Sequence, residues 1–481
     1  MARHILGSFL LVFLLIPGVA RAQSQGAQAQ PAASSGPDLR ALESQSITWL
    51  QSLIRINTSN PPGNDIAAAR YLQGVLKNEG IDAQVFESSP GRGFVVARLS
   101  ATALPNPSRA LLLVSHLDTP PTDASKWKVD PFGGSVDGSY LYGRGAIDDK
   151  SMAVANMAAL IELKRSNARL DRDVIFLGVG DGGAADGSGM KFAVEKNWDK
   201  IAAGFAINTG GRVAVKDGKV QYVGIQVDEK VSRNLDVIAS GTPGRSWLPN
   251  ENNAVAHLAA AMEKIAAYRT PVQFTFLTND YFDGLARIED SETSKWMRVL
   301  GDPERQAHAV QKISEESPVW GAMMHDTIAP TVIQAGTQPN SIPAEARGIV
   351  NLRLVPGSLI EPLVAKLQQA VDDQQVQLQI EQDGAPTAPA SSIESELYTA
   401  IAQAAKQQFP GAAVLPYMSV ESTDSPFLRE RSVQTYGLLP FPLTDQEVLS
   451  ADGANERIDL DRFRQGVDFL YAVVSNFAVE K

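Results

Sequence analysis

Short apolar runs alternate with amphipathic segments along most of the chain. Residues 110–114 are apolar at every position, which is typical of a parallel strand buried on both faces of its sheet. Residues 151–164 instead carry apolar side chains at helical spacing. Similar patterns predict strands at 83–86, 95–99 and 174–179, and helices at 39–54, 66–79 and 461–477. This alternation predicts a three-layer α/β/α sandwich with a site at the carboxyl ends of its strands.

A second pattern begins near Lys230. It predicts a strand at 235–239, a helix at 253–267, strands at 331–335 and 348–355, a helix at 359–371 and a strand at 376–380. This order is that of a small ferredoxin-like α+β domain. We therefore expect a main α/β domain in two parts, 38–228 and 385–481, and an inserted domain at 229–384 that contains a helical insertion at 270–325.

The N-terminus has the features of an export signal. Arg3 and His4 precede an apolar run at 5–16, and Ala20-Arg21-Ala22 provides a small-residue cleavage motif. The run is too short to span a membrane comfortably, so an uncleaved anchor is the weaker alternative. We expect a signal peptide at 1–22, a flexible linker at 23–37 and a secreted or periplasmic protein, cleaved near Ala22, with no membrane segment in its mature form.

Composition excludes several classes of protein. The chain has 481 residues, of which 44% are hydrophobic and 20% charged, enough for two domains with sizeable cores. A formal net charge of -11 argues against binding to nucleic acid or to an anionic membrane. With no cysteine, the protein owes nothing to disulfides.

The candidate chemistry starts where the strand at 110–114 ends. His116 and Asp118 lie two residues apart at that end, and Asp148 follows on a glycine-punctuated turn. Histidine nitrogen and aspartate oxygen are ligands that zinc takes, and a neighbouring carboxylate such as Asp118 can accept the other ring N–H of the histidine. The alternative is a packing histidine beside turn aspartates.

These residues also carry a family resemblance. His116-x-Asp118, then Trp127 and Asp130-Pro131-Phe132, then the run 141–150 (Leu-Tyr-Gly-Arg-Gly-Ala-Ile-Asp-Asp-Lys) resemble the zinc aminoacylase/carboxypeptidase-G family of co-catalytic metallopeptidases. The similarity covers about 39–477 and is greatest to the secreted carboxypeptidase and N-acyl-amino-acid hydrolase branch. The resemblance implies that His116 binds one metal, that Asp148 bridges two and that Asp118 orients His116. It also implies a catalytic-type main domain and a lid domain through which a homodimer can form.

Five positions depart from the family pattern. The family places its general base and a metal ligand, both glutamates, where this chain has Gly182 and Gly183. Another acidic ligand is replaced by Thr209, the lid histidine that steadies an oxyanion by Arg245, and the last ligand histidine by Asp452. Arg245 either donates a hydrogen bond to the oxyanion in place of that histidine or only occupies the space that the histidine takes in the family.

The losses have predictable consequences. Removing a positioned general base costs roughly 10²–10⁴ in rate. Losing even a partner of a ligand costs ~10–100-fold in metal affinity. We expect at most one weakly bound zinc ion, held by His116, Asp148 and Asp452, and no full two-zinc site. Asp181 and Asp186 are alternative carboxylates, although solvated loop aspartates are commoner.

Two functional hypotheses remain open. In the first, the protein is an exported relative of zinc carboxypeptidases and N-acyl-amino-acid hydrolases with impaired or absent catalysis, which binds a peptide-like or N-acyl amino-acid small molecule. In the second, it is an active one-metal peptidase or amidohydrolase acting on dipeptides or N-acyl amino acids. The absence of a glutamate at Gly182 and Gly183 favours the first.

Two lid residues match substrate-binding positions of the family. Asn340 corresponds to a contact with the substrate carbonyl and Arg353 to a contact with its carboxylate. An arginine fork suits a carboxylate, although a surface arginine on a sheet is an equally good interpretation of Arg353. His257 and His308 are interpreted as packing or surface residues, and His325 lies near a lid motif.

Overall fold

The fold is taken from a computed structural model, which describes residues 39–102, 106–180, 189–288, 291–381 and 384–480. Residues Leu39–Lys481 form one compact unit. The predicted signal peptide and linker lie outside the described residues, as do Asp181, Gly182, Gly183 and Asp186. No helix in the described part of the chain combines the length and apolar character needed to cross a bilayer.

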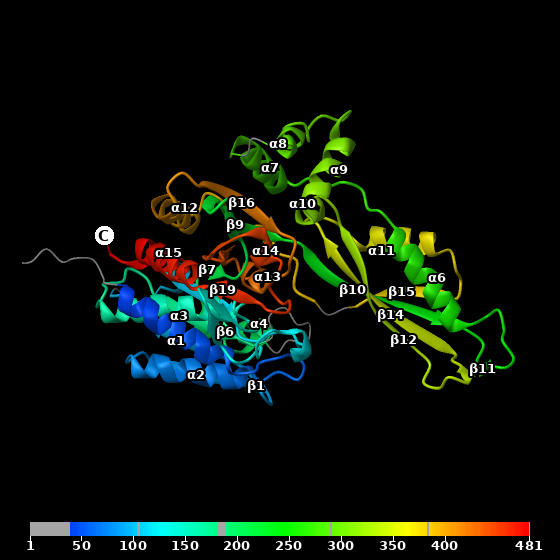
Figure 1. Ribbon diagram of the computed structural model, residues 1–481, viewed down its shortest axis with the longest axis horizontal. Helices are drawn as coiled ribbons and strands as arrows, with labels where there is room; N and C mark the ends of the chain where they lie inside the picture. Colours follow the sequence, from blue (N-terminus) through cyan, green and yellow to red (C-terminus); the bar gives the residue numbers. More distant parts are fainter. Residues whose placement is uncertain (1–38, 103–105, 181–188, 289–290, 382–383, 481) are drawn as a thin grey trace, which may run out of the picture. The chain divides into compact units, whose positions relative to one another are not determined.

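A large mixed sheet forms the centre of the main domain (Figure 1). Its middle strands run parallel in the order β6 (Val174–Val179), β3 (Leu111–His116), β7 (Phe205–Asn208) and β17 (Gln434–Gly437). On one side β2 (Arg92–Leu99) and β1 (Ala83–Ser89) continue it antiparallel. On the other side lie β9 (Lys219–Glu229), β8 (Arg212–Lys216), β18 (Pro442–Leu443) and β16 (Ala413–Ser419).

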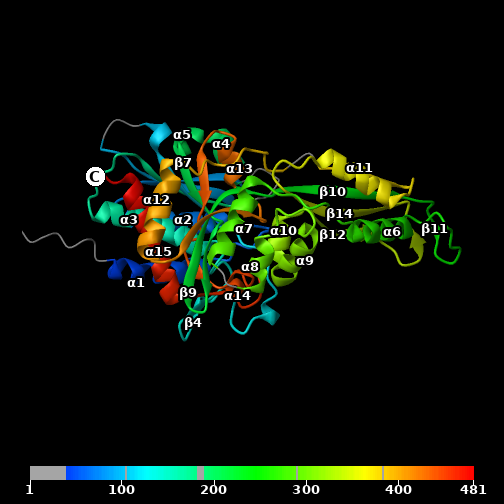
Figure 2. The same ribbon diagram turned by 90° about the horizontal axis from the view of Figure 1, so that it is seen from above.

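Helices cover both faces of this sheet, so the predicted three-layer α/β/α fold is confirmed. Successive side chains of β3 alternate between the two cores, because a strand has a period of two: Leu111 and Leu113 lie in one core, Leu112 and Val114 in the other. The first face is covered by α1 (Arg40–Ile54), α2 (Asp65–Asn78), α3 (Lys150–Arg165), α12 (Glu396–Gln408) and α15 (Leu460–Ala478). The second is covered by α4 (Met190–Lys196), α5 (Trp198–Ile201) and α13 (Ser425–Arg429) (Figure 2).

The inserted lid is a four-stranded antiparallel sheet in the order β12-β14-β10-β15. Its strands are β12 (Thr327–Ala335), β14 (Glu345–Leu354), β10 (Val231–Ser240) and β15 (Val376–Ile380). The helices α6 (Ala254–Ala267) and α11 (Ile360–Val371) pack on one face and bury every second residue of β14. The ferredoxin-like order is therefore confirmed, while the domain boundaries themselves stay predictions.

The helical insertion comprises α7 (Phe276–Ile288), α8 (Glu292–Met297), α9 (Gln306–Glu316) and α10 (Pro318–Met323). It packs against the main sheet as well as belonging to the lid. Its core joins Tyr281, Phe282 and Leu285 to Tyr222, Leu415 and Tyr417 of β9 and β16. The hydroxyl groups of Tyr222 and Tyr281 lie 2.8 Å apart. The insertion therefore links the lid to the main domain in addition to the two chain crossings.

The chain crosses between the two sheets twice. Lys230 is the single residue between β9 and β10, and the return crossing runs through 384–391 after β15. The Lys230 backbone is tied to the main domain, since its N–H donates to Ser419 O and its carbonyl accepts from Ser422 Oγ. Its Nζ donates to Ala322 O, His325 O and Thr327 Oγ1 of the lid. Lys230 thus joins both parts of the molecule.

Candidate metal and ligand site

His116 ends β3 at the carboxyl edge of the main sheet, where the sequence predicts a site. Its Nε2 lies 2.9 Å from Asp148 Oδ1, and its Nδ1 lies 3.1 Å from Asp118 O and 3.4 Å from Asp118 Oδ1. Burial opposes protonation of the ring, but the charge of Asp148 and hydrogen bonds to both aspartates raise the pKa of His116 well above its usual value. The structure thus brings His116, Asp118 and Asp148 together.

The turn that carries Asp148 is held by Glu456, which is fully buried. Glu456 accepts hydrogen bonds from the backbone N–H groups of Gly145, Ile147 and Asp148 and from Arg144 Nη1. Burial raises the pKa of Glu456 to about 7, while these hydrogen bonds oppose the shift. Glu456 therefore fixes the backbone that presents Asp148 to His116.

Asp149 completes a group of three potential metal ligands. One ligand atom from each of His116, Asp148 and Asp149 falls within 4.8 Å of the others. Asp149 is fully buried, its Oδ2 accepts the backbone N–H of His116 at 3.0 Å, and burial raises its pKa well above its usual range. A side-chain hydrogen bond from Thr209 partly offsets that shift. The sequence motif alone did not identify Asp149, because nothing in it tells which of two adjacent aspartates faces the histidine.

Asp452 lies near this group without joining it. Its Oδ1 is 3.6 Å from Arg144 Nη1, and burial together with the charge of Asp148 raises the pKa of Asp452 to about 6. The sequence predicts Asp452 as the third ligand beside His116 and Asp148, whereas in the structure the third member of the group is Asp149. A ligand role for Asp452 stays a prediction.

Glu421 is a further carboxylate of the site that sequence analysis missed. It follows β16 in a turn whose next residues contact Arg353 and Asn208, and it is exposed to solvent. The protein around its carboxyl group and the charge of Asp148 raise the pKa of Glu421, while the charge of Arg353 lowers it. No sequence motif indicates it, because its place depends on the meeting of the two domains.

Arg353 lies on β14 at the end next to the main domain. Its Nη1 donates to Ser422 Oγ at 3.1 Å and its Nε to Asn351 Oδ1 at 3.2 Å, and burial lowers its pKa. Arg353 therefore lies beside the turn that carries Glu421. Its Nε and Nη1 already donate hydrogen bonds within the protein.

Arg245 and Asn340 lie at the opposite end of the lid (Figure 1). Arg245 is paired with Ser341 in the short ladder of β11 (Gly244–Arg245) and β13 (Ser341–Ile342). Between this ladder and Arg353 runs the strand β14 from Glu345 onwards, a span of roughly 25 Å at ~3.4 Å per residue. The structure thus does not bring Asn340 and Arg353 of one chain to one small ligand.

The remaining histidines have local partners. His257 Nδ1 lies 2.6 Å from Asp373 Oδ2, and the His308 ring meets Trp296 edge-on. His325 Nδ1 lies 3.2 Å from Thr270 O. These contacts fit packing roles in the lid and its insertion.

Sequence comparison supports the resemblance seen in the motifs. Residues 112–476 match the family described as Peptidase family M20/M25/M40. The chain is 26% identical to human N-fatty-acyl-amino acid synthase/hydrolase PM20D1 over 371 residues, which cover 76% of this chain and 73% of that protein. It is 25% identical to probable carboxypeptidase S-like 2 of Dictyostelium discoideum over 381 residues, covering 76% and 72% of the two chains.

A solved structure shares the fold. The M20 family metallo-carboxypeptidase Sso-CP2 of Sulfolobus solfataricus superposes with a TM-score of 0.67 at 18% sequence identity, covering 91% of this chain and 99% of that one. The span that matches the family, 112–476, includes His116 and the whole lid sheet. The chain therefore belongs to peptidase family M20/M25/M40.

Proposed function

We propose that the protein binds peptide-like or N-acyl amino-acid ligands at the His116 site and does not perform the two-metal hydrolysis of its family. The observation that carries this proposal is the neutral Thr209 next to the buried Asp149. Where the family has an acidic metal ligand, this chain has a hydroxyl group. Gly182 and Gly183, which carry no side chain beyond hydrogen, remove the general base and a further ligand.

The donors fit one metal ion better than two. His116, Asp148 and Asp149 offer three ligand atoms within 4.8 Å, a set that suits a single zinc ion. Among the described family positions, a second ion would need ligands at Thr209 and Asp452, of which the first is neutral and the second lies beside Arg144. If His116, Asp148 and Asp149 held a zinc ion, it would supply a water molecule whose pKa is lowered to ~7. We expect at most one, weakly bound, zinc ion.

The ligand class follows from Arg353 and from the family. Family members act on peptide or N-acyl amino-acid substrates. Arg353 Nη1 is held by Ser422, and the guanidinium group retains further donors for a carboxylate. The role of this chain's residues is then to bind and orient a carboxylate-bearing ligand.

Calorimetry with N-acyl amino acids and dipeptides tests this proposal. We expect binding without turnover, and an affinity at least tenfold lower in Arg353→Ala, since a charge-assisted hydrogen bond contributes ~1.5–3 kcal/mol. Arg347→Ala is the matched control, because Arg347 lies on the same strand and pairs with Asp236 instead. Unchanged affinity in Arg353→Ala would assign that residue to the fold alone, and chelator-sensitive hydrolysis by the unaltered protein would contradict the proposal.

A one-metal hydrolase is the second candidate. The grouping of His116, Asp148 and Asp149 favours it, because three donors are enough for a catalytic zinc ion with an open position. Hydrolysis that rises with added zinc and saturates at one equivalent per chain would establish it in place of the first proposal.

We also propose that the protein is exported and cleaved near Ala22. The support is the basic start, the apolar run at 5–16 and the Ala-x-Ala motif. Mass spectrometry of the mature chain from its native host should find Gln23 as the first residue. An intact Met1 in the mature protein would contradict export by this route.

A homodimer through the lid is the proposed assembly. Arg245 and Asn340 lie too far from Arg353 to meet one ligand in the same chain, so these family positions can reach a ligand site only in a second copy. Sedimentation should therefore give a dimer, which Asn340→Arg weakens if the lid end lies in the interface. A monomer at micromolar concentration would leave both residues without a ligand role.

A further inference from the structure

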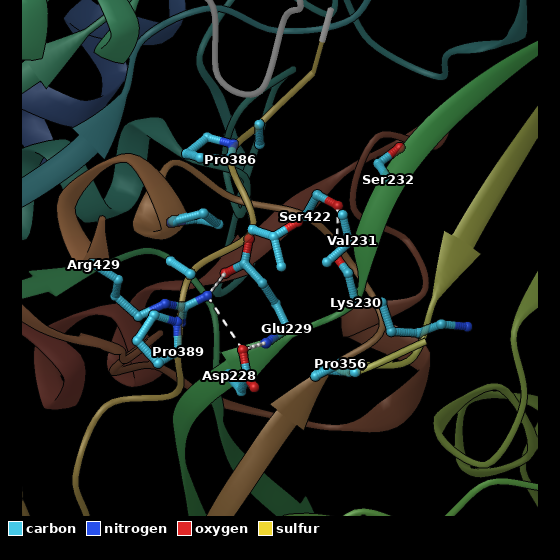
Figure 3. A pocket seen from close by; sticks show the side chains of 15 residues that line it. Asp228, Glu229, Lys230, Val231, Ser232, Pro356, Pro386, Pro389, Ser422 and Arg429 are labelled. Carbon is cyan, nitrogen blue, oxygen red and sulfur yellow. Dashed lines mark hydrogen bonds and ion pairs between the residues drawn. The ribbon is translucent and has the colours of Figure 1, made fainter. Parts of the chain in front are cut away.

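A cavity of about 270 Å³ lies where the chain crosses between the two domains (Figure 3). Its walls are the outgoing crossing at 228–232 and the return crossing at 385–389, joined by Pro356 and by Arg429 of α13. Proline and alanine side chains make much of the wall. This crossover cavity is separate from the His116 group, none of whose residues lines it.

Three charged side chains are buried at the floor of the crossover cavity: Asp228, Glu229 and Arg429, which are 6%, 2% and 5% exposed. Glu229 is fully engaged, accepting from Thr423 N–H, Thr423 Oγ1 and Gln226 Nε2. Arg429 Nη2 lies 3.3 Å from Asp228 Oδ1 and 3.9 Å from Glu229 Oε2. Two carboxylates therefore share one guanidinium group.

One carboxylate oxygen of Asp228 lacks a partner in the described part of the protein. Its Oδ1 accepts the backbone N–H of Glu229 and faces Arg429. Its Oδ2 has no hydrogen-bond or ion-pair partner among the described residues, and Figure 3 shows that oxygen pointing away from Arg429. The nearby ammonium group of Lys230 points out of the cavity to its three lid acceptors. Asp228 is 6% exposed as a residue, yet its Oδ2 keeps access to solvent, so a cation that reaches this oxygen can form a charge-assisted contact with it.

Asp228 also lines a second, more open cavity of about 550 Å³. Asp228 and Pro356 line both cavities, which are therefore neighbours. The second cavity is walled by apolar side chains of α7 and the return crossing, among them Phe276, Leu277 and Ile393. The Phe276 side chain is 67% exposed, which leaves apolar surface available beside the charge.

We propose that the crossover cavity binds a primary ammonium group on a small aliphatic body, with the ammonium at Asp228 Oδ2 and the aliphatic part against Pro356 and the apolar wall. An organic ammonium matches both the Asp228 oxygen that faces away from Arg429 and the apolar surroundings. The ligand touches both crossings at once, so its binding stabilises the arrangement of lid and main domain. The ligand differs in chemistry from the one proposed for His116 and Arg353, which is recognised by its carboxylate, although Ser422, which accepts from Arg353, also lines this cavity.

Calorimetry and thermal unfolding with leucinamide test the proposal, because this probe has an ammonium group and an isobutyl body but no carboxylate. We expect one leucinamide per chain, and no binding of N-acetyl-leucinamide, which lacks the charge. Asp228→Asn should weaken binding at least tenfold. Asp217→Asn is the matched control, since Asp217 is exposed in the β8–β9 turn at φ 51°, a conformation that asparagine also adopts.

A second variant keeps the test decisive if Asp228→Asn fails to fold. Ala388→Leu fills the crossover cavity and leaves Asp228 and Arg429 unchanged, so it should abolish the binding of leucinamide. Asp452→Asn should leave binding intact. Absence of binding to the unaltered protein, or binding lost in Asp452→Asn but kept in Asp228→Asn and Ala388→Leu, would overturn the proposal.

Discussion

Glu456 is the residue on which the geometry of the Asp148 turn depends. Its carboxylate accepts three backbone N–H groups and Arg144 Nη1, all within a buried environment. We predict that Glu456→Ala lowers the free energy of unfolding by about 3–5 kcal/mol, because it leaves buried donors and a buried arginine without their partner. Urea unfolding followed by circular dichroism measures this loss.

Glu304→Ala is the control for that measurement. Glu304 is exposed and its side chain has no hydrogen bond or ion pair among the described residues, so its removal should change stability by less than about 0.5 kcal/mol. Equal effects of the two substitutions would show that Glu456 does not hold the turn.

Single residues of the site were predictable only where a motif marks them. His116, Asp118 and Asp148 were predicted, and the structure brings them together. Asp149 and Glu421 were missed: the first because local backbone geometry decides which of two adjacent aspartates faces His116, the second because its surroundings come from both domains. Arg353 and Asn340 were both predicted to meet a ligand, yet the length of β14 separates them. Counting residues along that strand would have revealed the separation.

Helices and strands could be predicted from the sequence where burial gives the apolar residues a regular pattern. The strand at 174–179 was predicted at its observed bounds, because every residue of β6 is buried and the run is apolar throughout. The docking of the helical insertion was not, since its contact with β9 and β16 depends on aromatic residues distant in sequence such as Tyr222 and Tyr281. The sequence analysis placed a domain change near Lys230 but not the contacts of its side chain, because their three acceptors lie more than ninety residues further along the chain.

The Lys230 crossing predicts a pH dependence of stability. Burial lowers the pKa of Lys230 from 10.5 to about 8. Between about pH 8 and 10.5 the unfolded chain keeps a proton that the folded chain has released, so this group makes the folded state more stable as pH rises. The contribution is complete above the unfolded pKa and is lost as pH falls through about 8.

Urea unfolding between pH 7.5 and 9.5 measures this effect against Lys230→Met. The difference in unfolding free energy between the two proteins should shift in favour of the unaltered protein by up to about 1.4 kcal/mol per pH unit above pH 8. Lys219→Met, at an exposed position on β9, should show no such shift. A pH-independent difference for Lys230→Met would mean that its ammonium stays charged in the folded protein.

At the scale of the whole molecule, the chain has the fold of family M20, while its motifs predict changes at five functional positions. We predict that restoring glutamates at Gly182 and Gly183, aspartate at Thr209 and histidines at Arg245 and Asp452 recreates zinc-dependent hydrolysis of N-acyl amino acids or dipeptides. The change at Asp452 is compatible with its φ of 58°, since histidine is among the residues found in that region. Chromogenic or mass-spectrometric assays with and without a chelator measure the outcome.

A restored variant that folds, binds two zinc ions and still hydrolyses nothing would show that further parts of the site have been lost. The variant with only Arg245→His is the control, because it changes the lid and none of the metal ligands. It should remain inactive.

The central claim is that the site no longer holds the two metal ions of its family, and zinc content tests it most directly. Protein purified without chelator and dialysed against metal-free buffer should contain less than one zinc ion per chain by plasma mass spectrometry. His116, Asp148 and Asp149 supply one set of donors, and Thr209 cannot supply an acidic ligand for a second ion. Two tightly held zinc ions per chain would contradict this account and restore the protein to the catalytic members of its family.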